Sequence, residues 1–191
     1  MNIQAVQLGE VQETLLKFFQ ENESRTLLPY SAFDESWVAQ IKEATPPPPY
    51  IFISEASTIY FSEARNRQLL ALLAKHFPGY YYIFDTATNY FIHRGRGRRQ
   101  DKHDVLRFFS AHTKWEVNDI QEVQAWDENH NHLKSVNFFT DPPEYLKKHI
   151  PLGYRILGKI LSLFNFPFVQ QYQLNVFQLG SPLGKKTTPK F

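Results

Sequence analysis

The sequence contains no cysteine, and this absence excludes several kinds of site. None of the 191 residues carries a thiol, so a disulfide framework, a zinc–thiolate centre and a cysteine nucleophile are all unavailable. No apolar run approaches the roughly 18–20 residues of a transmembrane helix. The amino terminus also lacks the basic-then-apolar order of a signal peptide. We therefore expect a cytoplasmic protein with no membrane partner, and we assign no metal site.

An excess of charge of one sign is also missing. The chain has 21 basic and 19 acidic residues, a net charge of +2, which gives no global drive toward nucleic acid or membrane. Any such partner has to be argued from a local feature. The arginine- and glycine-rich run at 93–99 is one, but it is short and lacks the repeated aromatic platform of RNA-binding modules. A solvated loop is the favoured interpretation, so we do not expect a nucleic-acid partner.

The hydrophobic content is that of one ordinary globular domain. Hydrophobic residues make up 42% of the chain, and a chain of this length can bury a substantial core. We expect a single domain over residues 1–180. The basic segment 181–191 is predicted to be a flexible tail.

The clearest local pattern is a strand, a helix and a second strand in succession. The apolar run at 50–53 is short and rich in β-formers, and Ser62 is a candidate N-cap for a helix with leucines at helical spacing. A second apolar run follows at 80–84. This succession has the size of a βαβ unit, whose ligands gather at the carboxyl ends of the strands. Glu55 and Asp85 are therefore expected at one edge of the sheet.

Strands and helices alternate through the rest of the chain. Further strands are expected at 3–8, 26–30, 134–139 and 172–179, and helices at 11–19, 37–42, 119–126 and 156–164. Alternation of this kind is typical of an α/β sheet.

Several short groups of residues occur in an order that is typical of one family. They are Ser31-Ala32-Phe33-Asp34 with Trp37, Ile53-Ser54-Glu55 with Ile59-Tyr60-Phe61, Phe84-Asp85, Lys114-Trp115 with Asp119, and Ala125-Trp126. Up to about Gly180 the chain resembles the class I S-adenosylmethionine-dependent O-methyltransferases of the leucine carboxyl methyltransferase and tetracenomycin polyketide methyltransferase type. The resemblance implies a Rossmann-like α/β sheet, mostly parallel with an antiparallel C-terminal strand. It also implies methyl transfer from S-adenosylmethionine to a small-molecule hydroxyl or carboxylate.

The resemblance also implies where the cofactor would bind. The residues implied are Gln7, Ser31, Ala32, Phe33, Asp34, Ser54, Glu55 and Tyr60. The turn at 31–34 would hold the adenine ring, and Glu55 would close a strand under the methionine end of the cofactor, with Tyr60 nearby. Two structural alternatives stay open: Glu55 as a buried carboxylate that caps the next helix, and Asp34 as a helix N-cap.

The departures from the family pattern predict impaired function. By the resemblance, residues 3–8 would be the family's second strand, and we therefore expect this sequence to lack the first strand with its glycine-rich turn and the N-terminal helices. Gln7 stands where an acidic residue is usual for the ribose hydroxyls, and an amide loses the charge-assisted bonds. We expect weak cofactor binding, and self-association through an exposed sheet edge at 3–8. A non-catalytic scaffold or partner-binding protein is the alternative function.

The sequence does not identify the general base. His93, His103 and His112 follow the last expected cofactor strand, on the substrate side. A lone histidine in a loop is usually just exposed, so none of them is assigned a catalytic role.

Overall fold

The computed structural model describes residues 5–8, 25–44, 49–90, 92, 113–137, 142, 144–163 and 172–180. The strands are β1 (Ala5–Leu8), β2 (Arg25–Leu28), β3 (Ile51–Ser54), β4 (Tyr81–Ala87), β5 (Asn131–Val136) and β6 (Tyr172–Gln178). The helices are α2 (Ser36–Ala44), the 3-10 turn η1 (Thr58–Tyr60), α3 (Glu63–His76), α5 (Ile120–Gln124), α6 (Glu144–Lys147) and α7 (Leu152–Leu163). The helix expected at 11–19, the run at 93–99 and the tail at 181–191 lie outside the described residues.

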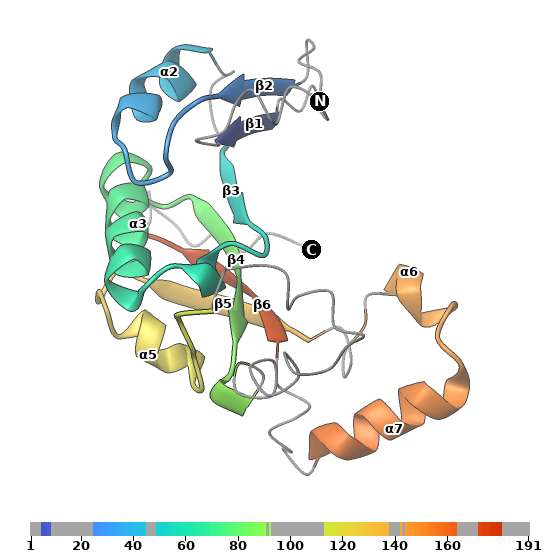
Figure 1. Ribbon diagram of the computed structural model, residues 1–191. Helices are drawn as coiled ribbons and strands as arrows, with labels where there is room; N and C mark the ends of the chain where they lie inside the picture. The colour runs from blue at the N-terminus through green and yellow to red at the C-terminus, as the bar shows by residue number, and fades with distance from the viewer. Residues whose placement is uncertain are drawn as a thin grey trace, which may run out of the picture.

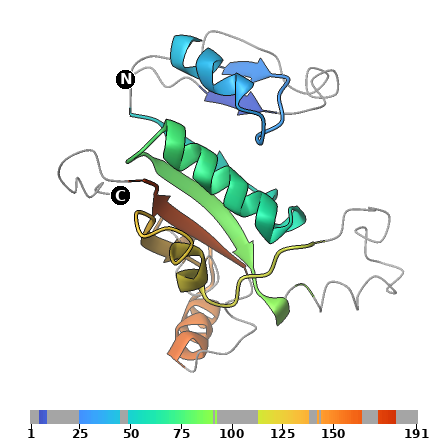
Figure 2. The same cartoon turned by 90° about the vertical axis from the view of Figure 1, so that its left-hand side faces the viewer.

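The strands form one four-stranded sheet and one two-stranded sheet. The larger sheet has the order β3-β4-β6-β5, and β1 pairs with β2 in parallel. β3 runs parallel to β4, whereas β6 is antiparallel to both β4 and β5. The predicted α/β sheet with an antiparallel C-terminal strand is thus confirmed. In both views the β1–β2 pair lies beyond the β3 side of the larger sheet (Figure 1, Figure 2).

Strand direction brings several chain ends to one edge of the larger sheet. Because β6 is antiparallel to its two neighbours, β3, β4 and β5 all end at the edge where β6 begins. The register places Tyr172, the first residue of β6, opposite Ala87, the last residue of β4. We call this the carboxyl edge.

The βαβ unit follows the sequence prediction closely. Ser62 is the N-cap of α3 and its side chain accepts a hydrogen bond from the Arg65 N–H at 3.4 Å. The helix ends at His76, and Gly79 then adopts a φ of 82°, a conformation that glycine reaches without steric cost. One boundary was wrong. β4 continues to Ala87 instead of closing before Asp85, because the first residues of β6 extend the hydrogen-bonded ladder.

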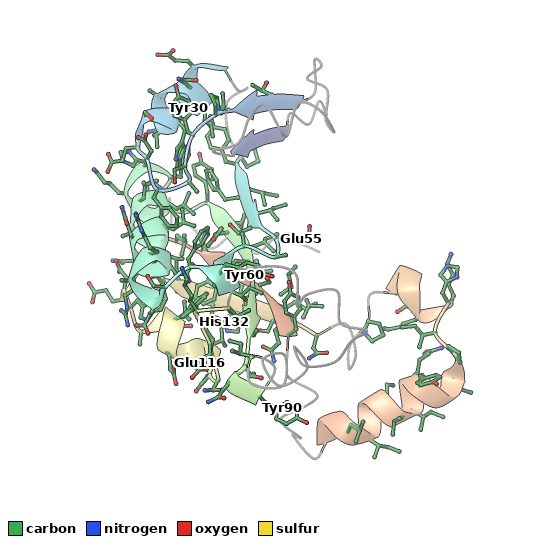
Figure 3. The ribbon with its side chains drawn as sticks, viewed as in Figure 1. Tyr30, Glu55, Tyr60, Tyr90, Glu116 and His132 are labelled. Carbon is green, nitrogen blue, oxygen red and sulfur yellow. The ribbon has the colours of Figure 1, made fainter. Side chains whose placement is uncertain are left out.

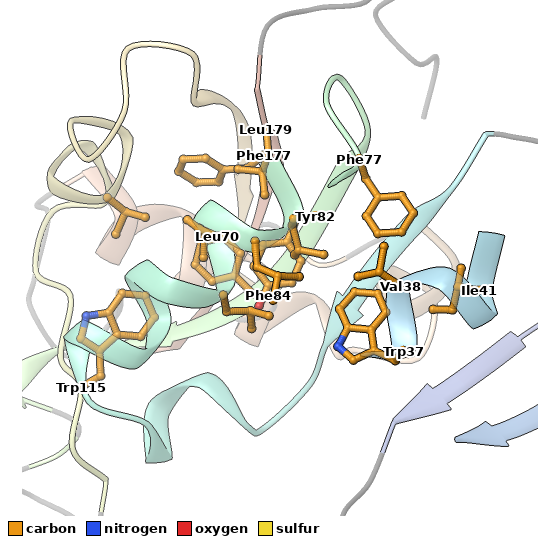
Figure 4. Packing of buried hydrophobic residues seen from close by; sticks show 14 of the residues in the cluster. Trp37, Val38, Ile41, Leu70, Phe77, Tyr82, Phe84, Trp115, Phe177 and Leu179 are labelled. Carbon is orange, nitrogen blue, oxygen red and sulfur yellow. The ribbon is translucent and has the colours of Figure 1, made fainter. Parts of the chain in front are cut away.

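The core lies between the four-stranded sheet and the helices α2 and α3. Trp37 of α2 stacks on Phe77 with ring centroids 5.9 Å apart, and Phe84 of β4 packs against Phe177 of β6 at 5.4 Å (Figure 4). All four side chains are at most 2% exposed. Truncation of one such aromatic residue to alanine typically costs about 3–5 kcal/mol of stability, so these contacts fix α2 and α3 on the sheet.

The C-terminal half differs from expectation in detail. β5 begins at Asn131, three residues before the predicted start, since Asn131 and His132 pair with Gln178 and Phe177 of β6. α6 was not predicted. α7 lies on the opposite side of the sheet from α3 (Figure 1). Within the described part of the chain, no helix is both long and apolar enough to cross a membrane.

Candidate functional site

A buried carboxyl group lies close to the carboxyl edge. Asp85 is fully buried in β4. Its Oδ2 accepts a hydrogen bond from the Tyr172 hydroxyl at 2.5 Å, and its Oδ1 accepts one from Thr58 Oγ1 at 3.3 Å. Thr58 Oγ1 also lies 2.5 Å from the Asp85 carbonyl oxygen. The Asp85 carboxyl group is therefore held mainly by the Tyr172 hydroxyl of β6, while Thr58 of η1 donates mainly to the Asp85 backbone carbonyl.

The residues around this carboxyl group form one polar cluster. Burial raises the pKa of the Tyr172 hydroxyl well above its ordinary value, and the hydrogen bond to Asp85 and the nearby Asp85, Glu55 and Tyr60 raise it further. Tyr172 thus stays protonated at neutral pH and acts as a hydrogen-bond donor. Asn66 of α3 donates to the Thr58 carbonyl at 3.0 Å. The cluster therefore joins η1, α3, β4 and β6.

The end of β3 presents an exposed carboxylate. Glu55 follows β3 and is exposed, and Figure 3 shows it at the end of the strand with Tyr60 on the adjoining turn. Ser54 does not face solvent freely, because its Oγ accepts a hydrogen bond from the Tyr82 hydroxyl at 3.0 Å. The interpretation of Glu55 as a buried capping carboxylate is wrong: Ser62 caps α3, and Glu55 is available to a ligand.

Backbone strain occurs next to Glu55. Ala56 has a φ of 51°, the one positive value for a non-glycine residue in the described part of the chain. A left-handed conformation costs an alanine roughly 1–2 kcal/mol. A strained backbone conformation persists only when the surrounding structure holds it in place, and such conformations cluster at ligand sites. The bend at Ala56 separates the exposed Glu55 from the buried start of η1.

The turn at 31–34 is tied to the helix that follows it. Asp34 Oδ1 accepts a hydrogen bond from the Ser36 N–H at 2.9 Å, and this bond lowers the pKa of the Asp34 carboxyl group. The alternative in which Asp34 caps a helix is therefore what the structure contains. The Ala32 carbonyl accepts a hydrogen bond from Trp37 Nε1 at 3.3 Å, and the Phe33 N–H lies 3.5 Å from Ser31 Oγ.

Phe33 connects this turn to the segment after β3. Its ring meets the Phe61 ring edge-on, with centroids 4.8 Å apart at 85°. The Arg65 guanidinium lies 4.8 Å from the centroid of the Phe33 ring. Phe61 directly follows η1, which contains Tyr60. The turn at 31–34 and the end of β3, which are far apart in the sequence, are thus brought to adjoining positions.

The predicted residues are recovered to different degrees. Gln7 lies in β1 opposite Leu27, and its side chain is outside the described structure. His93, His103 and His112 are outside it as well. Thr58 and Tyr172 were missed, because a threonine in a turn and the first residue of a strand carry no local signal of a shared partner. Across the described ranges, no group of three or more acidic or histidine side chains could hold a metal ion.

Comparison with known proteins finds similar folds among solved structures. No protein-family model and no curated protein matches the chain by sequence. A candidate methyltransferase from Thermobifida fusca YX matches with a TM-score of 0.59 at 8% identity, covering 93% of this chain and 64% of that one. PKMT2 from Rickettsia typhi matches at 0.53 and 11% identity, covering 96% and 44%. A SAM-dependent methyltransferase from Anabaena variabilis matches at 0.53 and 7% identity, covering 93% and 77%.

These likenesses show the fold. The chain has the α/β fold of S-adenosylmethionine-dependent methyltransferases, in agreement with the order and directions of its strands. It spans less than two thirds of the length of the Thermobifida and Rickettsia proteins. At these identities the fold does not carry an activity with it.

Proposed function

We propose that the chain is an S-adenosylmethionine-dependent O-methyltransferase-like protein that acts on a small-molecule hydroxyl or carboxylate. The observation that carries the proposal is the junction between the turn at 31–34 and the end of β3, made by the contact of Phe33 with Phe61. In open α/β sheets, nucleotide-like ligands bind beyond the carboxyl ends of the strands. This junction joins segments that follow two such ends, those of β2 and β3.

The residues at this junction suit part of the cofactor. Phe33 is half-buried, and the Arg65 guanidinium lies over its ring, so a flat base would stack on the other face or displace the arginine. The exposed carboxylate of Glu55 with the ring of Tyr60 suits a cationic group. The cofactor, when bound, supplies an activated methyl group. The described residues include no glycine-rich turn for its amino-acid end, so the fit is partial and affinity is expected to be low.

The chain's own contribution to methyl transfer would be positioning. Holding an acceptor oxygen in line with the methyl group supplies most of the catalytic advantage in such a reaction, and a base is needed only for a hydroxyl acceptor. Tyr172 is a poor candidate for that base, because burial and Asp85 raise the pKa of its hydroxyl. Its one hydroxyl hydrogen is already donated to Asp85 Oδ2, so it can serve a group at the carboxyl edge only as a hydrogen-bond acceptor.

The test is a titration of the full 191-residue chain with S-adenosylhomocysteine, in which binding is measured by NMR and by calorimetry. Each missing charge-assisted contact is worth roughly 1.5–3 kcal/mol, so the loss of two moves a micromolar site to roughly millimolar affinity. We expect saturable millimolar binding that Phe33→Ala and Glu55→Ala both weaken. Glu55→Ala leaves the melting temperature unchanged, since Glu55 is exposed.

A matched control keeps the result specific. Tyr154→Ala removes an exposed aromatic residue on α7, away from the junction, and should not change the affinity. Binding that neither Phe33→Ala nor Glu55→Ala affects would place the cofactor elsewhere. A micromolar dissociation constant would contradict the partial fit, and no binding at several times the expected millimolar constant would refute the cofactor proposal.

A non-catalytic scaffold is the second candidate function. Two observations favour it: in the described chain no strand joins β1 to β3, and the Asp34 carboxylate is already used by the Ser36 N–H. A scaffold would unfold cooperatively, and neither S-adenosylmethionine nor its product would raise its melting temperature. A ligand-dependent rise would reject this candidate, because a ligand that binds the native state stabilises it.

A further inference from the structure

The helix α7 exposes a group of large apolar side chains. Leu152 is 65% exposed, Ile156 50%, Leu157 44% and Ile160 46%. These four residues are among nine large hydrophobic side chains that are exposed in the described structure. Isolated exposed apolar residues are ordinary, but a contiguous group of them marks an interaction surface.

These side chains share one face, and that face points away from the protein. Leu152, Ile156 and Ile160 recur every fourth position, which aligns them along a helix. Gly153 lies on the same side, where an added Cβ would meet no atom within 4 Å. By contrast, Gly158 on the other side is buried and Arg155 is half-buried. The helix is therefore most buried on the side of Gly158, and it leaves most of its large apolar side chains exposed.

The charges around this apolar face are almost all positive. Within 144–163, the basic residues are Lys147, Lys148, Arg155 and Lys159, together with His149. The acidic residue of this segment is Glu144, which pairs with Lys147 at 2.7 Å. The chain as a whole is close to neutral, so this segment is a local concentration of positive charge.

We propose that α7 and the turn before it form a peripheral docking surface for an anionic lipid membrane. An amphipathic helix with Leu and Ile on one side and Lys and Arg beside them lies in the plane of the membrane interface. Lys148, exposed in the turn before α7, can extend its ammonium group to lipid phosphates. Tyr154 is also exposed on α7, and tyrosine suits the boundary between apolar and wet regions.

The charge pattern selects this occupant over a second copy of the chain. Two α7 helices packed face to face would bring two basic segments together, and like charges across an interface oppose association. An anionic bilayer supplies both an apolar interior and the opposite charge. The sequence-based expectation of no membrane partner rested on the lack of a membrane-spanning segment, and no described helix is long and apolar enough to span a membrane. Docking of this kind requires no span, so the proposal departs from that expectation.

The test is co-sedimentation of the full chain with vesicles. We expect binding to phosphatidylcholine vesicles that contain about 30% phosphatidylglycerol, little binding to pure phosphatidylcholine, and a decrease as salt is raised. Ile156→Glu with Ile160→Glu should weaken binding at least tenfold, with an unchanged melting temperature because both side chains are exposed. Leu133→Glu, an exposed apolar position on β5, is the matched control and should bind like the parent chain.

A second pair of variants tests the charge. Lys148→Glu should weaken binding to the anionic vesicles at least fivefold, since each cation near such a surface contributes about fivefold. Lys134→Glu, exposed on β5, carries the same change of charge and should have little effect. The proposal is overturned if the parent chain does not bind these vesicles or if the Ile156→Glu, Ile160→Glu variant still does. It is also overturned if sedimentation shows a dimer that this variant abolishes.

Discussion

The hydroxyl of Tyr172 should stabilise the native state through Asp85. Tyr172→Phe removes the donor that lies 2.5 Å from Asp85 Oδ2 and keeps the aromatic ring. The ring packs beside the small buried cluster of Ile59, Ala87 and Ile92. The substitution therefore changes the polar contact while it leaves the packing in place.

The expected loss follows from the burial of the acceptor. Asp85 is fully buried, and a buried polar group that loses a partner costs about 1–3 kcal/mol. The single hydroxyl hydrogen of Thr58 is donated to the Asp85 carbonyl oxygen at 2.5 Å and lies toward Oδ1 only at 3.3 Å, so it compensates little for the lost donor. Thr58→Val removes a hydroxyl that contacts the same residue, and its effect should couple with that of Tyr172→Phe by more than about 0.5 kcal/mol.

The pH dependence gives a second signature of the same contact. The pKa of the Tyr172 hydroxyl is raised in the folded state, so the unfolded chain releases this proton first. The stabilisation is fully present below the unfolded pKa of about 10 and is lost as the pH rises above it toward the folded pKa. The parent chain should therefore lose stability more steeply than Tyr172→Phe between about pH 9.5 and 11.

Urea unfolding at a series of pH values measures both effects. Tyr154→Phe is the matched control, since Tyr154 is 63% exposed, and it should change neither the free energy of unfolding nor its pH slope. If Tyr172→Phe is as stable as the parent at pH 7 and shows the same alkaline slope, the hydrogen bond between Tyr172 and Asp85 contributes nothing and the cluster is not a unit.

Three further predictions concern other parts of the chain. Gly180 has a φ of +74°, and an added Cβ would lie 3.1 Å from Pro78 and from the Ala74 carbonyl. Gly180→Ala should therefore lower the free energy of unfolding by about 1–3 kcal/mol, whereas Gly153→Ala, in open space on α7, should be neutral or stabilising in the same urea experiment. Burial lowers the pKa of His130, and neither ring nitrogen has a hydrogen-bond partner among the described residues. The free energy of unfolding should therefore decrease as the pH falls below about 6.5, and His130→Phe should make this decrease shallower. An equally steep decrease in the variant would show that the imidazole is already protonated in the native state. Self-association through the edge of β1 remains a prediction. Sedimentation at protein concentrations of roughly tens of micromolar tests it, and a stable monomer there would exclude it.

Local pattern was sufficient to predict the βαβ unit. The β-formers of β3, the cap at Ser62 and the leucines of α3 each act within a few residues of one another, so a short window of sequence contains the whole signal. Glu55 was singled out both by its place after a strand of this unit and by the family resemblance, and the turn at 31–34 by the resemblance alone. The contact of Phe33 with Phe61 between these segments was not predicted, because it depends on packing between distant parts of the chain.

Features that depend on pairing between distant strands could not be predicted. Asp85 and Thr86 look like the polar end of a strand, yet β4 continues through them because Leu174 and Gln173 of β6 pair with them. Tyr172 reaches Asp85 only through that register. The exposure of the apolar residues of α7 was equally hidden, because their spacing is the same whether that face is covered or exposed.

The candidate site is positioned by side-chain packing more than by the sheet. β2, which precedes the turn at 31–34, pairs with β1, and in the described structure neither strand is hydrogen-bonded to β3. What fixes the turn is Trp37, which is 1% exposed, donates to the Ala32 carbonyl and stacks on Phe77. A close-packed interior transmits displacement directly. A cavity at Trp37 would therefore move Phe33 relative to Phe61, and the geometry of the proposed cofactor site depends on a core residue that does not belong to it.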